Sequence, residues 1–232
     1  MIKRLILGDG LLGTELIRQT GWDYISRKKD GIDFSNIDSY KDHLFGYDEI
    51  INCIACTNTY DENKEENWNT NYKGVANLVD LCNILGKKII HISTDYLYTY
   101  SKVGATENDV PVHCKNWYGY TKLLADGYVQ LKSNNFLLLR NTHKKNPFPH
   151  ENAWVNQIGN FDYVDIITKY IVKLINKNAV GIYNVGTDVK TIYQLAKKTN
   201  KDVKLTYSMI DETAPTNVIM DVSKLEMFLG DE

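Results

Sequence analysis

The sequence predicts an α/β fold, with a doubly wound parallel sheet of the Rossmann type and a small C-terminal substrate lobe. Two observations predict it. Short apolar segments typical of buried strands alternate with segments of helical period, and parallel strands need such crossover connections. A glycine loop, "LGDGLLG", follows the first apolar segment and opens the first helical one, as in dinucleotide-binding folds.

The order of elements extends through most of the chain. Strands are predicted at residues 3–8, 22–26, 49–55, 87–94, 135–141 and 181–186, where short apolar runs occur. Helices are predicted at residues 13–19, 35–44, 67–85, 119–132 and 164–175, where apolar residues recur with helical period. The remainder predicts a helix at 191–199, a strand at 203–207, a turn at 211–217 and a last helix at 222–230.

A change of pattern near residue 141 predicts two parts. The segment that follows has two prolines, several polar residues and little periodicity, as expected of a lobe or lid. We therefore expect a Rossmann domain at residues 1–140 and a small lobe at residues 141–232 that is partly interleaved with it.

Composition excludes several classes of partner. The 232 residues are 43% hydrophobic and 24% charged, with a formal net charge of -2, which favours neither nucleic acid nor an anionic membrane surface. The chain has no apolar stretch near the ~20 residues that span a bilayer and no cleavage site after its first apolar run, so a cytoplasmic protein is expected. Cys53 and Cys56 form a single CxxC without a second pair, which favours core thiols, and no spacing indicates a metal site.

The glycine loop supplies the first candidate site. Gly8, Gly10 and Gly13 stand directly after a strand and at the start of a helix. In this context one glycine allows the turn, the next lets the backbone approach a pyrophosphate, and the third lets the helix pack on the strand. Leu11 and Leu12 begin that helix, and its N-terminal N–H groups favour phosphate. The loop therefore predicts dinucleotide binding.

The end of the second strand bears on which dinucleotide binds. Arg27 and Lys28 follow that strand, and basic groups there favour the 2'-phosphate of NADP. Asp30 or Asp33 could instead bind the ribose hydroxyls of NAD. The sequence thus favours NADPH and leaves NADH open.

The choice of catalytic residues depends on position, because six Tyr and Lys pairs share the interval of four residues. Ligands of doubly wound sheets bind beyond the carboxyl ends of the strands. The fourth strand brings Thr94 to that edge, and the next long helix presents Tyr118 and Lys122 in its first turns. We predict these three residues as a proton-donating cluster beside a nicotinamide.

Motifs along nearly the whole chain then resemble a known family. They are the glycine loop, "IDFSNIDSY", "IINCIACTNTYDENKEENWNTNYKGVANL", "HISTDYLY", "YGYTK", "LLLRNT", "NQIGNFDYVD", "GIYNVGTD" and "NVIMDVSKL". Together they resemble the extended short-chain dehydrogenase/reductase family and, within it, the dTDP-4-dehydrorhamnose reductases. The resemblance implies NADPH-dependent reduction of a 4-keto-6-deoxy nucleotide sugar to the 4-hydroxy sugar, in deoxysugar biosynthesis.

The resemblance also implies roles for individual residues. Thr94, Tyr118 and Lys122 match the catalytic triad, in which the tyrosine donates a proton and the lysine holds the nicotinamide ribose. Residues expected beside the cofactor are Asp33 and Phe34 near adenine, with Ala55, Cys56 and Asn71 lining the cleft. Residues expected beside the substrate are Thr94, Asp95, Tyr96, His143 and Trp154.

Three alternatives accompany this interpretation. Related dehydratases have an acid pair where this chain has Asp95 and Tyr96, so carbonyl reduction is favoured over dehydration. His113 and Cys114 could serve a bifunctional epimerase/reductase, although adjacent loop residues usually point apart. A non-catalytic dinucleotide-binding regulatory subunit would keep the same fold without turnover.

Two departures from the family concern the substrate. His143 stands where the reductases have an aromatic residue in an R-T-S-W motif, and the chain is shorter than typical members between "RNTH" and "NQIGN". Trp154 could provide a stacking surface in place of the missing part. A trimmed lobe could accept another nucleotide sugar or depend on a partner subunit, so a homodimer is one hypothesis.

Overall fold

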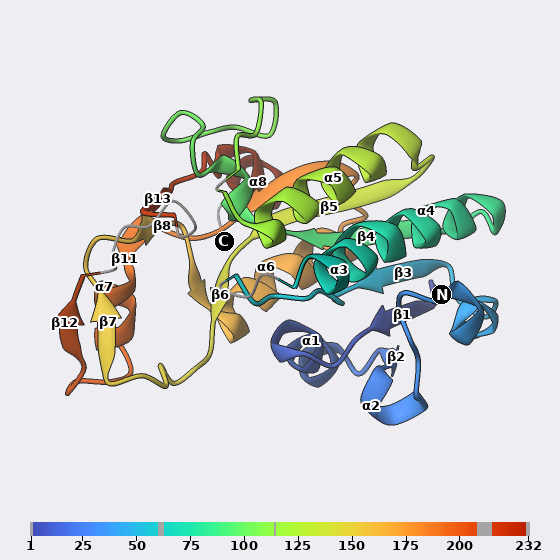
Figure 1. The fold of residues 1–232 in the computed structure, drawn as a ribbon, viewed down its shortest axis with the longest axis horizontal. Coiled ribbons are helices and arrows are strands. Elements are labelled where there is room, and N and C mark those ends of the chain that lie inside the picture. The colour runs from blue at the N-terminus through green and yellow to red at the C-terminus, as the bar shows by residue number, and fades with distance from the viewer. Residues whose placement is uncertain (1, 60–62, 114, 208–214, 231–232) are drawn as a thin grey trace.

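The central feature of the computed structural model is a six-stranded parallel sheet, as predicted (Figure 1). The structure describes residues 2–59, 63–113, 115–207 and 215–230. The strands are β1 (Arg4–Leu7), β2 (Asp23–Ile25), β3 (Glu49–Asn52), β4 (Lys88–Ser93), β5 (Phe136–Asn141) and β10 (Gly181–Val185). Their spatial order is β10-β5-β4-β3-β1-β2, so the chain turns to opposite sides of β1 when it forms β2 and β3. A switch point therefore lies between β1 and β3.

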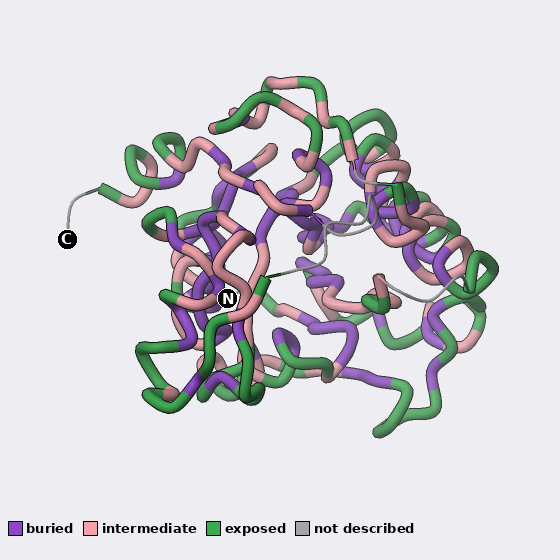
Figure 2. Tube along the Cα trace, turned by 60° about the vertical axis from the view of Figure 1, so that its left-hand side comes forward, coloured by how far each residue is buried: buried purple, intermediate pink, exposed green. Residues whose placement is uncertain are grey.

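Helices cover both faces of the sheet (Figure 1). On one face, α1 (Leu11–Thr20) packs against α6 (Val164–Asn176), and Leu16 and Ile171 share a core cluster with Ile6. On the other face lie α4 (Gly74–Ile84) and α5 (Trp117–Lys132), whose core cluster includes Leu78 and Ile50. Because strand side chains alternate between faces, the near-continuous apolar strands are buried on both sides (Figure 2).

Local hydrogen bonding changes two of the predicted helices. Residues 35–44 form two short 3-10 turns, η1 (Ile37–Ser39) and η2 (Lys41–Leu44), in place of one helix. Asn36 Oδ1 accepts from Asp38 N at 3.1 Å and Ser39 Oγ donates to the Asp33 carbonyl at 2.8 Å, which competes with α-helical bonding. The helix expected at 67–85 begins earlier, with α3 (Lys64–Asn67) and a π-helical segment, η3 (Trp68–Lys73), before α4.

The part of the chain after β5 builds the lobe from short strands, of which only the strand at residues 203–207 was predicted, and the structure confirms it as β12 (Lys204–Thr206). Three small sheets pair β6 (His143–Lys144) with β9 (Asp162–Tyr163), β7 (Asn152–Trp154) with β12 (Lys204–Thr206), and β8 (Ile158–Gly159) with β11 (Lys190–Thr191) and β13 (Asn217–Val218). The helix α7 (Ile192–Lys197) belongs to the lobe, whereas α8 (Ser223–Leu229) packs against β10 of the main sheet. Residues 211–214 of the predicted turn lie outside the described residues. The division near residue 140 stays a prediction, since α6 and β10 return to the main sheet.

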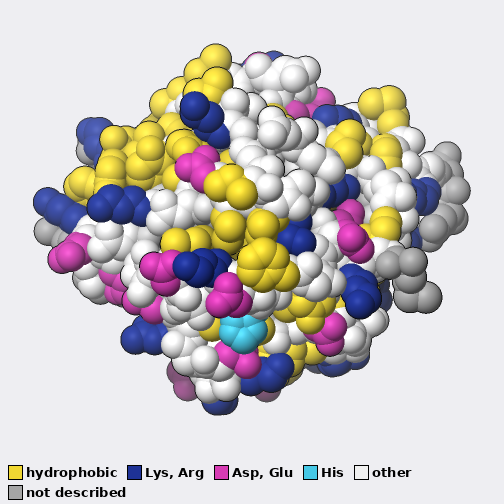
Figure 3. Space-filling model, turned by 90° about the vertical axis from the view of Figure 1, so that its right-hand side faces the viewer, with side chains coloured by type: hydrophobic (Ala, Val, Ile, Leu, Met, Phe, Trp, Pro, Cys, Tyr) yellow, Lys and Arg dark blue, Asp and Glu magenta, His cyan; other side chains and the backbone are white. Residues whose placement is uncertain are grey.

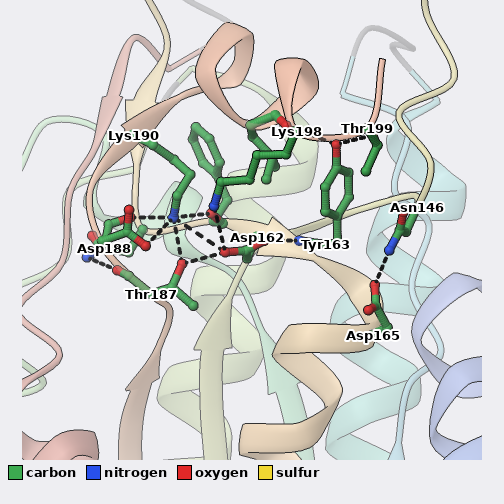
Figure 4. Close-up of polar contacts among 12 residues, drawn as sticks. Asn146, Asp162, Tyr163, Asp165, Thr187, Asp188, Lys190, Lys198 and Thr199 are labelled. Atoms are coloured by element: carbon green, nitrogen blue, oxygen red, sulfur yellow. Dashed lines mark hydrogen bonds and ion pairs between the residues drawn. The ribbon is translucent and has the colours of Figure 1, made fainter. Parts of the chain in front are cut away.

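A buried lysine ties the lobe strands together. Lys190 Nζ donates to Thr187 Oγ1 at 2.7 Å and to the Asp188 carbonyl at 2.6 Å, and it lies 3.5 Å from Asp162 Oδ2 (Figure 4). Asn146 Nδ2 donates to Asp165 Oδ1 at 2.8 Å, which fastens the loop after β6 to α6 (Figure 4). These bonds join the loop after β10 to β9, and the loop after β6 to the start of α6.

The surface has the mixed character that the composition predicts. On the face shown in Figure 3, acidic and basic side chains are interspersed and do not form a large area of one sign. Within the described ranges, no helix combines the length and the apolar character that crossing a membrane requires.

Candidate active site

A cavity of about 390 Å³ lies at the carboxyl edge of the sheet, beside the switch point. Gly10 and Leu12 line it from the start of α1, Thr94 from the end of β4, and Tyr118 and Lys122 from α5. The three residues predicted as catalytic therefore come from distant parts of the chain to one cavity. Leu11, Cys53, Ala55, Tyr96, Asn141, Thr142, His143 and Lys144 also line it.

The glycine loop leaves room for a ligand. Gly8 has φ +96, and a Cβ at Gly13 would lie 3.0 Å from the Gly8 carbonyl carbon and closer still to its oxygen. Any side chain at Gly13 would push α1 off β1. A Cβ at Gly10, by contrast, would meet nothing within 4 Å, and Gly10 caps α1 without a side-chain hydrogen bond. The loop thus presents backbone and a helix N-terminus to open space, as pyrophosphate binding requires.

A second cavity of about 260 Å³ adjoins the loop on the β2 side. Arg27, Asp33 and Phe34 line it together with Gly8, Gly10, Ala55 and Cys56, and the role predicted for Asp33 and Phe34 beside adenine stays a prediction. Asp33 Oδ1 accepts from the backbone N–H and the hydroxyl of Ser35, which orders this loop. Lys28 is exposed in α2 (Arg27–Asp30) and is not among the residues that line this cavity.

Asn71 lies behind the cleft and supports its wall. Its Oδ1 accepts from Cys56 N at 2.8 Å, and its Nδ2 donates to the Cys56 carbonyl at 2.9 Å and to Thr121 Oγ1 at 3.3 Å. Asn71 therefore fixes the loop after β3 against α5, and it does not line either cavity described above.

Local caps position the predicted catalytic hydroxyls. Asn116 Oδ1 accepts from Gly119 N at 2.6 Å, which starts α5 at Trp117 and places Tyr118 in the first turn. Thr94 caps the short 3-10 helix η4 (Asp95–Tyr98), and its Oγ1 accepts from Tyr96 N at 3.2 Å. The Tyr96 ring packs edge-on against Tyr118, with ring centroids 5.7 Å apart. Both hydroxyl-bearing residues are thus held at the same cavity.

Lys122 points from α5 toward the end of β4. Its Nζ donates to the Ile92 carbonyl at 2.6 Å and lies 3.3 Å from His91 Nε2. Burial is the main cause that lowers the pKa of Lys122 to about 8, against the opposing charge of Asp126. The lysine is therefore far closer to losing its proton than a solvated one.

Asp95 is completely buried beneath the cavity and does not line it. Its Oδ1 accepts from the Thr142 hydroxyl, while Oδ2 has no partner in the described structure. Burial raises the pKa of Asp95 to about 6, although Thr142 and Lys144 oppose this shift. Asp95 therefore holds the strand end together, and its predicted contact with substrate stays a prediction.

His143 and Trp154 belong to a larger cavity of about 780 Å³ in the lobe. Phe148 and Gln157 line it as well, and Leu11, His143 and Lys144 line both this cavity and the one beside Tyr118. Burial lowers the pKa of His143 to about 4, so its imidazole is neutral. The lobe cavity thus opens next to the predicted catalytic residues.

Of the residue pair that an epimerase would use, His113 lies apart from the reaction cavity. Its ring packs against Tyr120, with centroids 5.7 Å apart, and it does not line the cavity beside Tyr118. Cys114 lies outside the described residues.

Cys53 lines the cavity as a thiol without a disulfide bond. Burial raises its pKa to about 12, so the thiol is inert.

Sequence reasoning missed three residues near the site. His91 and Asn52 are fully buried polar residues that are register partners on neighbouring strands, and Lys144 lines both cavities. A histidine within the apolar run "KIIHIS" and an asparagine that ends "EIIN" are signals that could have identified the first two. Lys144 gave no signal, because its strand was not predicted.

Comparisons with known proteins agree with this geometry. The family model described as RmlD substrate binding domain matches residues 3–143. Spore coat polysaccharide biosynthesis protein SpsK of Bacillus subtilis is 26% identical over 73% of this chain and 59% of its own length. The dTDP-4-dehydrorhamnose reductase of Mycolicibacterium smegmatis is 28% identical over 56% of this chain and 42% of its own length. The chain thus spans less than two thirds of each curated relative.

Solved structures establish the fold. A dTDP-4-dehydrorhamnose reductase from Clostridium acetobutylicum superimposes with a TM-score of 0.84 at 22% identity, covering 99% of this chain and 94% of that one. The dTDP-4-dehydrorhamnose reductase from Bacillus anthracis, in complex with NADP, gives a TM-score of 0.81 at 22% identity over 98% and 92% of the two chains. With the family match over more than half of its length, the chain belongs to the RmlD substrate binding domain family.

Proposed function

We propose that this protein is an NADPH-dependent reductase of a 4-keto-6-deoxy nucleotide sugar. One observation supports it above all others. Thr94, Tyr118 and Lys122 line a single cavity with Gly10, at the switch point where doubly wound folds bind dinucleotides. The reductase names of the relative and of the structural neighbours agree with this reaction class.

The cofactor would lie across the glycine loop. Gly10 offers open backbone for the pyrophosphate, and Phe34 and Asp33 line the cavity suited to the adenosine. Arg27 lines the same cavity and would bind the 2'-phosphate that distinguishes NADPH from NADH. Lys28 is the weaker candidate for that phosphate, because it does not line this cavity.

The residues of the cavity would then reduce a ketone. The reduced nicotinamide supplies the hydride when bound. Negative charge develops on the carbonyl oxygen, and the Tyr118 hydroxyl donates a proton to it. The Thr94 hydroxyl stabilises that oxygen, and Lys122 holds the ribose and favours the phenolate form of Tyr118. The adjoining lobe cavity, with Trp154 and His143, would hold the rest of the nucleotide sugar.

The test replaces Tyr118 by phenylalanine. With NADPH and a panel of 4-keto-6-deoxy nucleotide sugars, absorbance of the reduced cofactor should fall with the wild-type protein. Tyr118→Phe should lower kcat by roughly 10²- to 10⁴-fold, the usual worth of a general acid, while NADPH binding persists. Tyr120→Phe is the matched control, because Tyr120 lies two residues away on α5 and does not line the cavity.

Two results would contradict the proposal. Unchanged turnover in Tyr118→Phe would remove this phenol from the chemistry. If the wild-type protein binds NADPH and oxidises none of it with any sugar of the panel, the protein is instead a non-catalytic binding module.

A further inference from the structure

Four polar groups form a buried chain behind the reaction cavity. Asn52 of β3 and His91 of β4 are register partners in the sheet, and both are 0% exposed. Ile54 N donates to Asn52 Oδ1 at 3.0 Å, and Asn52 Nδ2 lies 3.2 Å from His91 Nδ1. His91 Nε2 lies 3.3 Å from Lys122 Nζ, which ends the chain at the cavity.

The hydrogen bond from Ile54 N to Asn52 Oδ1 fixes the direction of every other hydrogen bond in this series of buried groups. A backbone N–H can only donate, so Asn52 Oδ1 is the acceptor and the Asn52 amide group faces His91. His91 Nδ1 must then accept, and a neutral imidazole carries its one hydrogen on Nε2. That hydrogen points at Lys122 Nζ, and only a neutral amine has a lone pair to receive it.

The charge of Asp126 opposes this preference, but that carboxylate is already bound by other groups. Asp126, one turn further on α5, is held by Arg140 of β5 in a bidentate ion pair and by Ser93 Oγ of β4 at 2.9 Å. Cys53, directly after β3, is a thiol whose pKa is raised to about 12 by burial, so it is neutral.

None of the described residues that line the cavity is acidic. They include Tyr118 of α5 and, from β6, Lys144 and His143, whose imidazole is neutral. His91 is also kept neutral, because burial holds the pKa of its imidazole well below its usual range.

We propose that the hydrogen-bond chain from Ile54 through Asn52 and His91 favours the neutral amine of Lys122 in the empty cleft, so that at pH 8.5 binding of NADPH returns a proton to it. His91 is thus a positioning residue that couples the protonation of Lys122 to occupancy of the cleft. The ribose oxygens of bound NADPH would accept hydrogen bonds from the Lys122 ammonium, which the protonated Nε2 of His91 cannot do. The negative phosphates would also favour the charged form of Lys122. This inference rests on the proposed function.

The experiment measures protons taken up when NADPH binds, by titration calorimetry at pH 8.5 in buffers of different ionisation enthalpy. At this pH an ordinary lysine, with a pKa of about 10.4, is already charged and takes up nothing. We expect the wild-type protein to take up a large fraction of one proton per site. Lys122→Met should abolish the uptake while NADPH still binds, although more weakly.

Asn52→Asp tests the direction of the chain. A carboxylate accepts from both Ile54 N and His91 Nδ1, which turns His91 Nε2 into an acceptor for a Lys122 ammonium. Proton uptake should therefore disappear in this variant, and the alkaline limb of the kcat/KM profile should move to higher pH. Asn77→Asp, on the exposed side of α4, adds the same charge away from the chain and should leave the uptake unchanged.

Several outcomes would overturn the inference. NADPH binding without proton uptake in the wild-type protein would do so, as would uptake that survives in Lys122→Met or in a folded Asn52→Asp. If Asn52→Asp does not fold, proton uptake by the wild-type protein and by Lys122→Met still tests the inference. Complete absence of NADPH binding would instead contradict the proposed function, and this inference with it.

Discussion

Single residues in the glycine loop decide whether the cofactor cleft exists. Gly13 has no room for even a methyl group, because the Gly8 backbone lies against it, whereas Gly10 faces open space. Gly13 thus allows α1 to pack closely on the loop, and Gly10 leaves the backbone accessible to a ligand. The sequence motif predicts that both positions are glycine, but only the tertiary structure distinguishes their roles.

Replacement of Gly13 by alanine should destabilise the protein. The added methyl group forces α1 away from β1, and overpacking of this kind costs about 1–3 kcal/mol or more. NADPH binding should weaken as well, because the loop moves. Urea unfolding and cofactor titration measure the two effects.

Gly127→Ala is the matched control for that change. Gly127 is an exposed position within α5, and a Cβ there meets nothing within 4 Å. Alanine should stabilise the helix by up to about 1 kcal/mol, since glycine is the poorer helix former. Equal losses in the two variants would show that the close contact at Gly13 is unimportant.

At the scale of elements, α5 is fixed to the sheet by a buried ion pair. Arg140 of β5 donates to both oxygens of Asp126, at 2.7 and 2.9 Å, and Ser93 at the end of β4 donates to the same carboxylate. Asp126 is one turn from Lys122 on α5 and Ser93 precedes Thr94, so this pair aligns the helix that carries Tyr118 and Lys122 with the strand end that carries Thr94.

Asp126→Asn should cost about 3–5 kcal/mol in the free energy of unfolding. The substitution leaves the guanidinium of Arg140, which is 1% exposed, without its counter-charge. Denaturant unfolding followed by circular dichroism gives the number. Asp38→Asn, which removes the partner of Lys41 in an exposed pair, is the control and should have no measurable effect. A loss as small as that of the control would mean that α5 does not depend on the ion pair.

At the scale of the whole molecule, buried titratable groups set the response to acid. His91 and His143 are neutral in the folded protein, with pKa values lowered chiefly by burial, and the unfolded chain protonates both below pH 6.5. Stability therefore falls as pH falls through this range. Asp95 acts in the opposite direction, because burial raises its pKa to about 6. As pH rises, the unfolded chain loses the Asp95 proton at a lower pH than the folded protein does, so this group favours folding at acid pH.

Between pH 4.5 and 6 the two histidines should outweigh the one carboxyl group. The free energy of unfolding should then fall by about 1.4 kcal/mol for each pH unit of acidification, the contribution of one net proton. Asp95→Asn removes the opposing group and should steepen the fall to about 2.7 kcal/mol per unit. Urea unfolding at several pH values measures both slopes.

The control for the acid response is His43→Gln. His43 is exposed, so its loss should leave the slope unchanged. A flat profile in the wild-type protein, or a slope unaffected by Asp95→Asn, would show that these buried groups do not govern the acid response.

Local and periodic features of the sequence determined the sheet, most of its helices and the candidate site. Alternating apolar runs require parallel strands with crossover helices, and the carboxyl ends of such strands lie at one edge, so Thr94, Tyr118, Lys122 and the glycines could be placed together. Tertiary structure decided what depends on contacts between distant segments. Apart from β12, which an apolar run predicts, the lobe strands are two or three residues long and have no sequence period. The burial that lowers the pKa of Lys122 exists only when β3, β4 and α5 meet.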